Sequence, residues 1–334
     1  MKITVLGAGN MGTTVAHVIS KNGYHVTIWN YEGDPEPLEQ IKTYHENKKY
    51  LPGIKLSRDI EVEPDLEKAL KGAGVVFYVM PSSFMDSVLT RVAGFVTEKV
   101  IIVDVSKGVK KQDWEVSKLH ARQLKPAETK LATIKKNMVT ISGPAIAGDL
   151  AKGGFTAMSV ASVNSLNVKK VVKILENDFL KLVPSNDIVG IKMAGALKNI
   201  YAILLGLCDG LKLPMNTKAF FLTESLKEIS LVLEKIGGKK ETVYSLAGLG
   251  DLIGTALCTT SRNRSFGEFL VYAETKSAAE QKVGQVVEGI EAVKKLRVLS
   301  KQLKIKLPLA EMVWKIVWKN QNIQSQFDTY LKRY

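Results

Sequence analysis

Short apolar runs alternate with amphipathic segments through the first half of the chain. The apolar runs predict strands at residues 3–6, 25–29, 75–80, 100–105 and 138–141, and helical spacing predicts helices at residues 11–21, 66–71, 84–95 and 112–124. The run at 75–80 is apolar throughout, as is typical of a strand buried on both faces of a parallel sheet. This alternation of strand and helix predicts an α/β fold with a doubly wound parallel sheet.

The pattern changes near residue 186. Beyond it helical spacing dominates, and we expect a long helix from Asn186 or Asp187 to about Gly206, with further helices at 218–236, 284–303 and 309–319. The 334 residues suit two domains, since one domain usually holds about 100–200 residues. We therefore expect a sheet domain at residues 1–186 and a mostly α-helical domain at residues 187–334.

A glycine-rich turn joins the first predicted strand to the first predicted helix. Its sequence is Gly7-Ala8-Gly9-Asn10-Met11-Gly12. The first glycine permits a tight turn, the second lets the backbone approach a pyrophosphate, and the third lets the helix pack closely on the strand. The start of the helix adds free N–H groups and a partial positive charge. An ordinary glycine turn is the alternative, but this strand–turn–helix context favours a Rossmann-type, dinucleotide-binding domain.

The end of the second predicted strand bears on the choice between NAD and NADP. An acidic residue there binds the ribose 2′-hydroxyl of NAD, whereas an arginine accommodates the 2′-phosphate of NADP. The strand ends at Trp29-Asn30, and Glu32 and Asp34 follow with no arginine nearby. This favours NAD(H) over NADP(H), although both carboxylates also fit an exposed acidic loop at residues 32–37.

One lysine lies alone in the most apolar stretch of the chain. Lys198 is the only charged residue between Met193 and Cys208. If it is buried, desolvation lowers its pKa toward the range useful for acid–base catalysis, and the adjacent Asn199 can donate to a substrate hydroxyl. A lysine that extends along the helix surface into water is the alternative.

Two other polar groups admit a functional and a structural interpretation. Asp251 stands alone in the glycine-rich stretch 247–252, where it can be the partner of a buried lysine such as Lys198, the N-cap of a short helix, or both. The donors in Ser261-Arg262-Asn263-Arg264 suit a phosphate group, but such clusters also occur in solvated loops.

Two further segments follow predicted strands. Lys107, in Ser106-Lys107-Gly108, comes after the strand at 100–105, and the turn Ser142-Gly143-Pro144-Ala145 comes after the strand at 138–141. The carboxyl ends of strands line the ligand crevice in open α/β sheets. We therefore expect Lys107 to meet an anion or a carbonyl oxygen, and the Gly143 turn to permit a close approach.

Composition narrows the function classes. Two cysteines, Cys208 and Cys258, and four widely separated histidines predict neither a disulfide framework nor a metal site. The net charge is +14, but its lysines are spread along the chain, so we expect an anionic small substrate and no nucleic-acid partner. The apolar stretch 193–208 is shorter than a membrane span, which argues against stable membrane insertion. Since no targeting segment is visible, we expect a soluble, cytoplasmic protein.

Taken together, these motifs resemble the NAD(P)-dependent glycerol-3-phosphate dehydrogenases over nearly the whole chain. The matching segments are GAGNMGT at 7–13, HENKKYLPG at 45–53, VSKG at 105–108, SGPAIA at 142–147, GALKNI at 195–200, LAGLGDLIGT at 246–255, SRNRSFG at 261–267 and VVEG at 286–289. The GALKN, GLGDL and SRN elements, in this order and spacing, are far more specific than the glycine motif.

The resemblance implies hydride transfer between dihydroxyacetone phosphate and sn-glycerol 3-phosphate, which supplies glycerol 3-phosphate for phospholipid synthesis. It implies NAD(H) or NADP(H) as cofactor and no metal. It also implies that Lys198 is the general acid–base residue, that Lys107 contacts both cofactor and substrate, and that Asp251 is the partner of Lys198. The other implied substrate contacts are Gly143, Ala145, Asn199, Thr255, Ser261, Arg262 and Asn263. The other implied cofactor contacts are Gly7, Gly9, Asn10, Met11, Gly12, Asn30, Ala147, Arg262, Val286 and Glu288.

Four positions depart from the usual pattern of that family, without removing an implied catalytic group. This chain has Met11 where the family commonly has an aromatic residue and Asn30 where it often has a basic residue. It has Phe155 where proline is usual and Lys192 where glutamate is usual. The alternatives are a related hydroxyacid or hydroxyacyl dehydrogenase with the same architecture, or a dinucleotide sensor without catalysis. The sequence leaves a homodimer open.

Overall fold

Residues 1–81, 84–107, 136–273 and 275–334 are described by the computed structural model, and the chain divides into two units. The sheet unit comprises Met1–Ser106 and Leu119–Ile188, and the helical unit comprises Lys107–Lys118 and Val189–Tyr334. Of the segment Lys107–Lys118, only Lys107 is described. The second division along the chain follows Ile188, close to the domain boundary that we expect after residue 186. The helix predicted at 112–124 lies outside the described residues.

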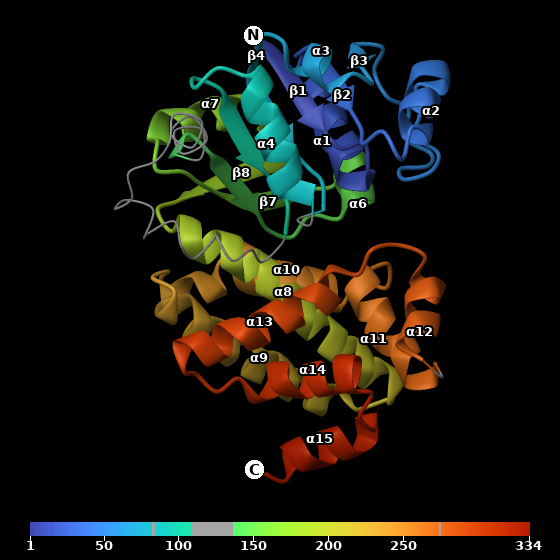
Figure 1. Cartoon of the computed structure of the whole chain (residues 1–334), viewed down its shortest axis with the longest axis vertical. Coiled ribbons are helices and arrows are strands. Elements are labelled where there is room, and N and C mark those ends of the chain that lie inside the picture. Colours follow the sequence, from blue (N-terminus) through green and yellow to red (C-terminus); the bar gives the residue numbers. More distant parts are fainter. Residues whose placement is uncertain (82–83, 108–135, 274) are drawn as a thin grey trace. The chain divides into compact units, whose positions relative to one another are not determined.

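An eight-stranded sheet organises the sheet unit, with the strand order β3-β2-β1-β4-β5-β6-β7-β8 (Figure 1). The strands are β1 (Lys2–Leu6), β2 (Val26–Trp29), β3 (Ile60–Val62), β4 (Ala73–Tyr78), β5 (Ile101–Asp104), β6 (Val139–Ser142), β7 (Thr156–Ala161) and β8 (Leu180–Ser185). The first six have the strand order of a Rossmann fold, which confirms the predicted architecture. The predicted sheet is wrong in one respect, because β6 and β7 pair antiparallel while all other neighbours are parallel.

Helices cover both faces of this sheet, so each central strand is apolar on both sides. Alternate residues of β4 show this: Val75 and Phe77 join one core, and Val76 and Tyr78 join the other. The first core also takes side chains from α1, α2, α6 and α7, and the second from α3 and α4. These helices are α1 (Asn10–Lys21), α2 (Glu36–Tyr44), α3 (Leu66–Leu70), α4 (Met85–Phe95), α6 (Ala147–Ala151) and α7 (Ser165–Leu175).

The helical unit is built around α8 (Ile188–Gly210), whose apolar residues run through its core. The other helices are α9 (Met215–Lys235), α10 (Asp251–Ala256), α11 (Arg262–Tyr272), α12 (Lys276–Val283), α13 (Glu288–Leu303), α14 (Pro308–Lys319) and α15 (Ile323–Leu331), with the short turns η3 (Lys240–Tyr244) and η4 (Leu246–Gly250). The predicted mostly α-helical second half is confirmed. The long helix extends four residues further than expected, to Gly210.

The helix α8 is longer than the apolar stretch 193–208 that it contains. The whole helix has 23 residues and is long and apolar enough to cross a membrane, whereas the stretch 193–208 by itself is too short. However, 83% of its most apolar window is buried inside the molecule, and it carries Lys198 and Asn199. These features are those of a central core helix.

Candidate functional site

The glycine turn lies between β1 and α1 in the sheet unit, as predicted. Gly7 has φ +109°, and a Cβ there would lie 2.6 Å from the carbonyl oxygen of Val79, so a side chain would clash as well as strain the backbone. A Cβ on Gly12 would lie 1.9 Å from the carbonyl oxygen of Gly7. These two glycines therefore set how closely the helix packs on the strand.

Gly9 differs from its two neighbours in the motif. A Cβ built there meets nothing within 4 Å, so this side of the turn faces open space. Gly9 is also the residue that precedes α1, whose first residues Asn10 and Met11 lack a side-chain cap. A tight turn with one open side at a helix N-terminus fits the pyrophosphate of a dinucleotide.

Two buried asparagines hold this turn in place. Asn30, at the end of β2, accepts a hydrogen bond from the Ala8 N–H at 2.9 Å and donates to the Asp34 carbonyl at 2.6 Å. Asn47 donates to the Ala8 carbonyl at 2.7 Å and to the Thr13 hydroxyl at 2.8 Å. Asn30 thus supports the turn from within. Sequence reasoning missed Asn47, although it lies in the segment HENKKYLPG on which the resemblance depends.

Carboxylates outnumber cations just after β2. Arg91 pairs with Glu32 at 2.7 Å, and Lys49 pairs with both Asp34 at 2.8 Å and Glu36 at 2.9 Å. Asp34 also accepts a hydrogen bond from the Tyr50 hydroxyl at 3.0 Å. Asp34 is partly buried and tightly held, so the exposed-loop interpretation does not describe it.

The helical unit brings two lysines to one buried carboxylate. Lys198 on α8 and Lys107 both pair with Asp251, each through a different carboxylate oxygen, and the Lys107 distance is 2.6 Å. Lys198 also donates to the hydroxyl of Thr255, one turn further along α10. The Lys198 side chain is 5% exposed, so the alternative of a lysine extending into water is wrong.

The position of Asp251 depends on a local irregularity. The π-helical turn η4 directly precedes α10, and Asp251 is the first residue of α10 rather than its cap. The N-cap of α10 is Gly250, so the N-cap interpretation of Asp251 is wrong, whereas its carboxylate reaches both lysines. Single π-type turns of this kind occur often at functional sites.

Burial makes Lys198 a group that can exchange a proton near neutrality. Loss of hydration lowers the pKa of the Lys198 ammonium group to about 7, the Asp251 carboxylate opposes this shift, and the charge of Lys107 adds to it. An acid–base group works best when its pKa lies near the working pH. This cluster can therefore donate or accept a proton at the Lys198 Nζ.

A chain of amide hydrogen bonds continues from this cluster. Asn263 donates to the Asn199 Oδ1 at 3.0 Å and accepts from the Gly289 N–H at 2.9 Å. Asn199 donates to Glu288 at 3.3 Å. Burial raises the pKa of Glu288, while the charges of Arg262, Lys107 and Lys198 lower it. The network fixes the side chains of Asn199 and Asn263 beside Lys198.

The donor cluster at the start of α11 is divided among several roles. Ser261 caps α11, since its hydroxyl accepts from the Arg264 N–H at 3.3 Å. Arg264 pairs with Asp209 at 2.6 Å and Glu268 at 3.0 Å. Arg262 is exposed and has no carboxylate within 4 Å among the described residues. Arg262 is thus the cation of this cluster that remains available to a ligand.

The other predicted contacts divide between the two units. Gly143 and Ala145 follow β6, and the Ala147 carbonyl accepts from the Thr14 hydroxyl on α1 at 3.2 Å, all within the sheet unit. Val286 is exposed just before α13 in the helical unit. In the part of the chain that the structure describes, no cluster of His, Cys, Asp and Glu is suited to hold a metal ion.

Fold and site together define a class: the nicotinamide-dependent dehydrogenases that join a Rossmann-type domain to a helical one. Two family models match, the NAD-dependent glycerol-3-phosphate dehydrogenase N-terminus over residues 2–168 and C-terminus over residues 187–328. The chain therefore belongs to the NAD-dependent glycerol-3-phosphate dehydrogenase family.

Individual relatives agree with this assignment. Glycerol-3-phosphate dehydrogenase (NAD(P)+) of Bacillus licheniformis is 31% identical over 99% of this chain and 94% of its own, and that of Bacillus subtilis is 32% identical with the same coverage. The crystal structure of glycerol-3-phosphate dehydrogenase from Coxiella burnetii has a TM-score of 0.89 at 31% identity and covers 99% of this chain and 98% of its own. The similarity thus extends over both units.

Proposed function

We propose that this protein interconverts dihydroxyacetone phosphate and sn-glycerol 3-phosphate, with NAD(H) as the preferred cofactor. The observation that carries the proposal is the buried cluster in which Asp251 pairs with Lys198 and Lys107. This is a proton-exchanging group beside a second cation, as reduction of a ketone requires. The related names and structures support the choice of substrate.

The bound nicotinamide supplies the hydride. Lys198 donates a proton to the C2 oxygen during reduction and takes it back during oxidation. Lys107 stabilises the negative charge that develops on the same oxygen, and Asp251 holds both ammonium groups in place. Thr255 accepts a hydrogen bond from Lys198 and orients it. Asn199, which donates to the Lys107 carbonyl at 3.5 Å, is proposed to contact a substrate hydroxyl group.

The phosphate end of the substrate needs a separate anchor. Arg262 is exposed at the start of α11 and free of carboxylate partners in the described part of the chain. Asn263 follows it, and Ser261 caps the same helix. An arginine at a helix N-terminus suits a phosphate, and binding energy at this remote end orients the reacting carbon. In the sheet unit, Gly143 and Ala145 are proposed as further substrate contacts.

The dinucleotide contacts are proposed from the turn that fits a pyrophosphate. They comprise Gly7, Gly9, Asn10, Met11 and Gly12, with Asn30, Ala147, Lys107, Arg262, Val286 and Glu288 as further contacts. NAD(H) is preferred because the cations near the end of β2, Arg91 and Lys49, are already bound to Glu32, Asp34 and Glu36. A 2′-phosphate would meet excess negative charge there.

The proposed cellular role is the supply of glycerol 3-phosphate for phospholipid synthesis in the cytoplasm. The hydroxyacid or hydroxyacyl dehydrogenase and sensor alternatives are not favoured, because both family models belong to glycerol-3-phosphate dehydrogenases.

The test is a substrate comparison. Purified protein is mixed with dihydroxyacetone phosphate, and the oxidation of NADH and NADPH is followed in parallel; dihydroxyacetone, which lacks the phosphate, serves as control. We expect rapid NADH oxidation with the phosphorylated substrate only. No oxidation by protein that binds both cofactors would discard the proposed substrate in favour of one of the alternatives.

A further inference from the structure

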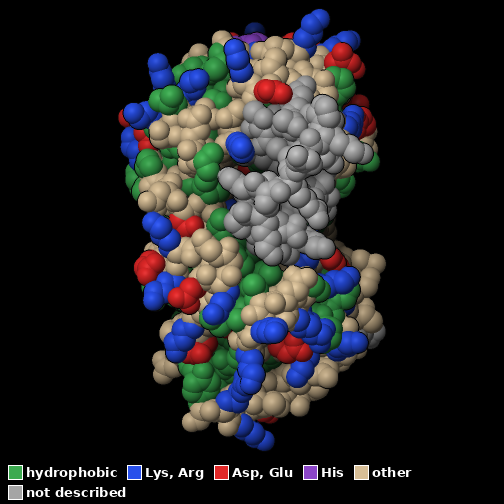
Figure 2. Space-filling view, turned by 60° about the vertical axis from the view of Figure 1, so that its left-hand side comes forward, with side chains coloured by type: hydrophobic (Ala, Val, Ile, Leu, Met, Phe, Trp, Pro, Cys, Tyr) green, Lys and Arg blue, Asp and Glu red, His purple; other side chains and the backbone are tan. Residues whose placement is uncertain are grey.

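The basic charge of this chain is concentrated at its C-terminal end, which the proposed reaction does not explain. Residues 294–334 contain ten Lys and Arg but only two Asp and Glu, a net charge of +8 out of +14. Figure 2 shows Lys and Arg side chains more abundant than Asp and Glu over the helical unit, in the lower part of that view. The cations themselves are spread along the chain, but this segment carries more than half of the net positive charge.

Much of this charge lines a cavity within the helical unit. The cavity, here called the basic pocket, has a volume of about 560 Å³ between α13, α14 and α15. The cations that line it are Arg297, Lys301, Lys306, Lys315 and Arg333, and its single lining carboxylate is Glu311. Its volume lies in the range of pockets that hold small organic ligands.

The carboxylates that line the basic pocket and its neighbouring cavity already have partners. Glu311 pairs with Arg297 at 3.0 Å. A neighbouring cavity of about 480 Å³ shares Lys306 and Arg333 with the basic pocket. Its two carboxylates, Glu224 and Glu228, bind Lys227 and the backbone N–H groups of α14, respectively.

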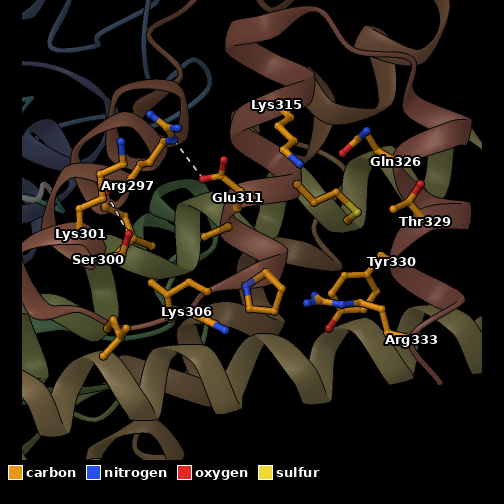
Figure 3. Close-up of a pocket in the computed structure, with 16 residues that line it drawn as sticks. Arg297, Ser300, Lys301, Lys306, Glu311, Lys315, Gln326, Thr329, Tyr330 and Arg333 are labelled. Carbon is orange, nitrogen blue, oxygen red and sulfur yellow. Dashed lines mark hydrogen bonds and ion pairs between the residues drawn. The ribbon is translucent and has the colours of Figure 1, made fainter.

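Four cations of the basic pocket are left without a carboxylate. Within the described ranges, no carboxylate lies within 4 Å of the charged groups of Lys301, Lys306, Lys315 and Arg333. Figure 3 shows Lys306 and Arg333 near one end of the pocket, with Lys315 and the Arg297–Glu311 pair near the other. Cations at both ends of the basic pocket suit a ligand that carries more than one negatively charged group.

We propose that the basic pocket binds a small, soluble anion that carries at least one phosphate group. Lys306 and Arg333 hold the phosphate, because they stand at the wall shared by both cavities. The apolar part of the lining, which includes Pro308 and Met312, accommodates the uncharged part of the ligand. This site lies outside the residues proposed for catalysis.

The test measures binding of pyrophosphate to the full-length protein by isothermal titration calorimetry. Lys306→Ala combined with Arg333→Ala should weaken pyrophosphate binding at least tenfold. The matched control is Lys235→Ala combined with Lys332→Ala, which removes the same charge from exposed positions outside both cavities. It should bind pyrophosphate like the wild type. Circular dichroism checks that both double variants fold.

Three results would overturn the proposal. The first is an affinity for pyrophosphate in the Lys306/Arg333 variant equal to that of the wild type. The second is an equal loss of pyrophosphate affinity in the control variant. The third is binding to phosphatidylglycerol vesicles, but not to pyrophosphate, that depends on Lys306 and Arg333. An unchanged KM for dihydroxyacetone phosphate in the Lys306/Arg333 variant would show that this pocket and the proposed catalytic site are separate.

Discussion

Asp251 pairs with two lysines at once, since its Oδ1 accepts from Lys198 and its Oδ2 accepts from Lys107 at 2.6 Å. One buried carboxylate therefore balances two ammonium groups, and the local charge stays positive when both lysines are protonated. This arrangement makes it easier for Lys198 to lose its proton, while Asp251 keeps the neutral lysine in position.

The pH dependence of the reaction follows from this relationship. The pKa of Lys198 is lowered to about 7, and reduction needs its protonated form. The kcat/KM for dihydroxyacetone phosphate reduction should therefore fall as the pH rises through about 7, and the reverse oxidation should rise. Asp251→Asn removes the charge that supports the ammonium group, so it should move this limb of the pH profile to lower pH. Identical profiles for the variant and the wild type would contradict the pairing role of Asp251.

The exposed Arg262 should act on the substrate phosphate. Arg262→Ala should raise the KM for dihydroxyacetone phosphate about tenfold to a hundredfold, because a hydrogen bond to a charged group contributes about 1.5–3 kcal/mol. The KM for NADH should change much less. Steady-state kinetics with each substrate varied in turn measure both, and Arg58→Ala, an exposed arginine in the sheet unit, is the control. A change confined to the cofactor would show that Arg262 is not the phosphate anchor.

Asp34 should influence cofactor choice. Asp34→Asn removes one carboxylate and leaves Lys49 paired with Glu36 alone, so a 2′-phosphate would meet less negative charge after β2. The ratio of kcat/KM for NADH to that for NADPH should fall by about tenfold, or about 1.4 kcal/mol. Asn47→Ala is the matched comparison, since loss of its bonds to the glycine turn should weaken both cofactors alike. If Asp34→Asn leaves this ratio unchanged, residues other than Asp34 determine the preference for NADH over NADPH.

Glu228 connects α9 to the start of α14. Its carboxylate accepts from the Leu309 N–H at 2.6 Å, the Ala310 N–H at 3.0 Å and the Tyr201 hydroxyl at 2.9 Å. Glu228→Gln replaces one acceptor oxygen with an NH₂ group, so at least one buried donor loses its partner. We expect a loss of about 1–3 kcal/mol in unfolding free energy, measured by denaturant titration. Glu234→Gln, at an exposed position on the same helix, should change the unfolding free energy little. An equal loss of unfolding free energy in both variants would contradict the role of the buried hydrogen bonds of Glu228.

Strong patterns predicted the elements around which the fold is organised. The apolar run of β4 and the apolar stretch of α8 identify elements that are buried on all sides. The sequence patterns do not predict the strands β3, β7 and β8. β8 contains Pro184, which argues against a central strand and is tolerated because β8 lies at the sheet edge. The antiparallel direction of β7 depends on tertiary pairing, which local periodicity does not report.

The site was predictable where a residue type contrasts with its surroundings. Lys198 and Asp251 are single charges in apolar or glycine-rich segments, and the structure joins them. Glu228 and Asn47 lie among other polar residues in the sequence, so their residue type does not set them apart from their neighbours. Their burial depends on partners 81 and 39 residues away in sequence, so it appears only in the folded chain.

The most direct test of this account is the turnover of Lys198→Ala. With NADH and dihydroxyacetone phosphate at saturation, we expect kcat to fall by about a hundredfold to ten-thousandfold, the usual contribution of general acid–base catalysis. The affinity for NADH, measured by fluorescence titration, should remain near that of the wild type. Lys235→Ala, an exposed lysine on α9, should keep full turnover. Turnover of Lys198→Ala within a few-fold of the wild type would contradict the assignment of Lys198 as the proton donor.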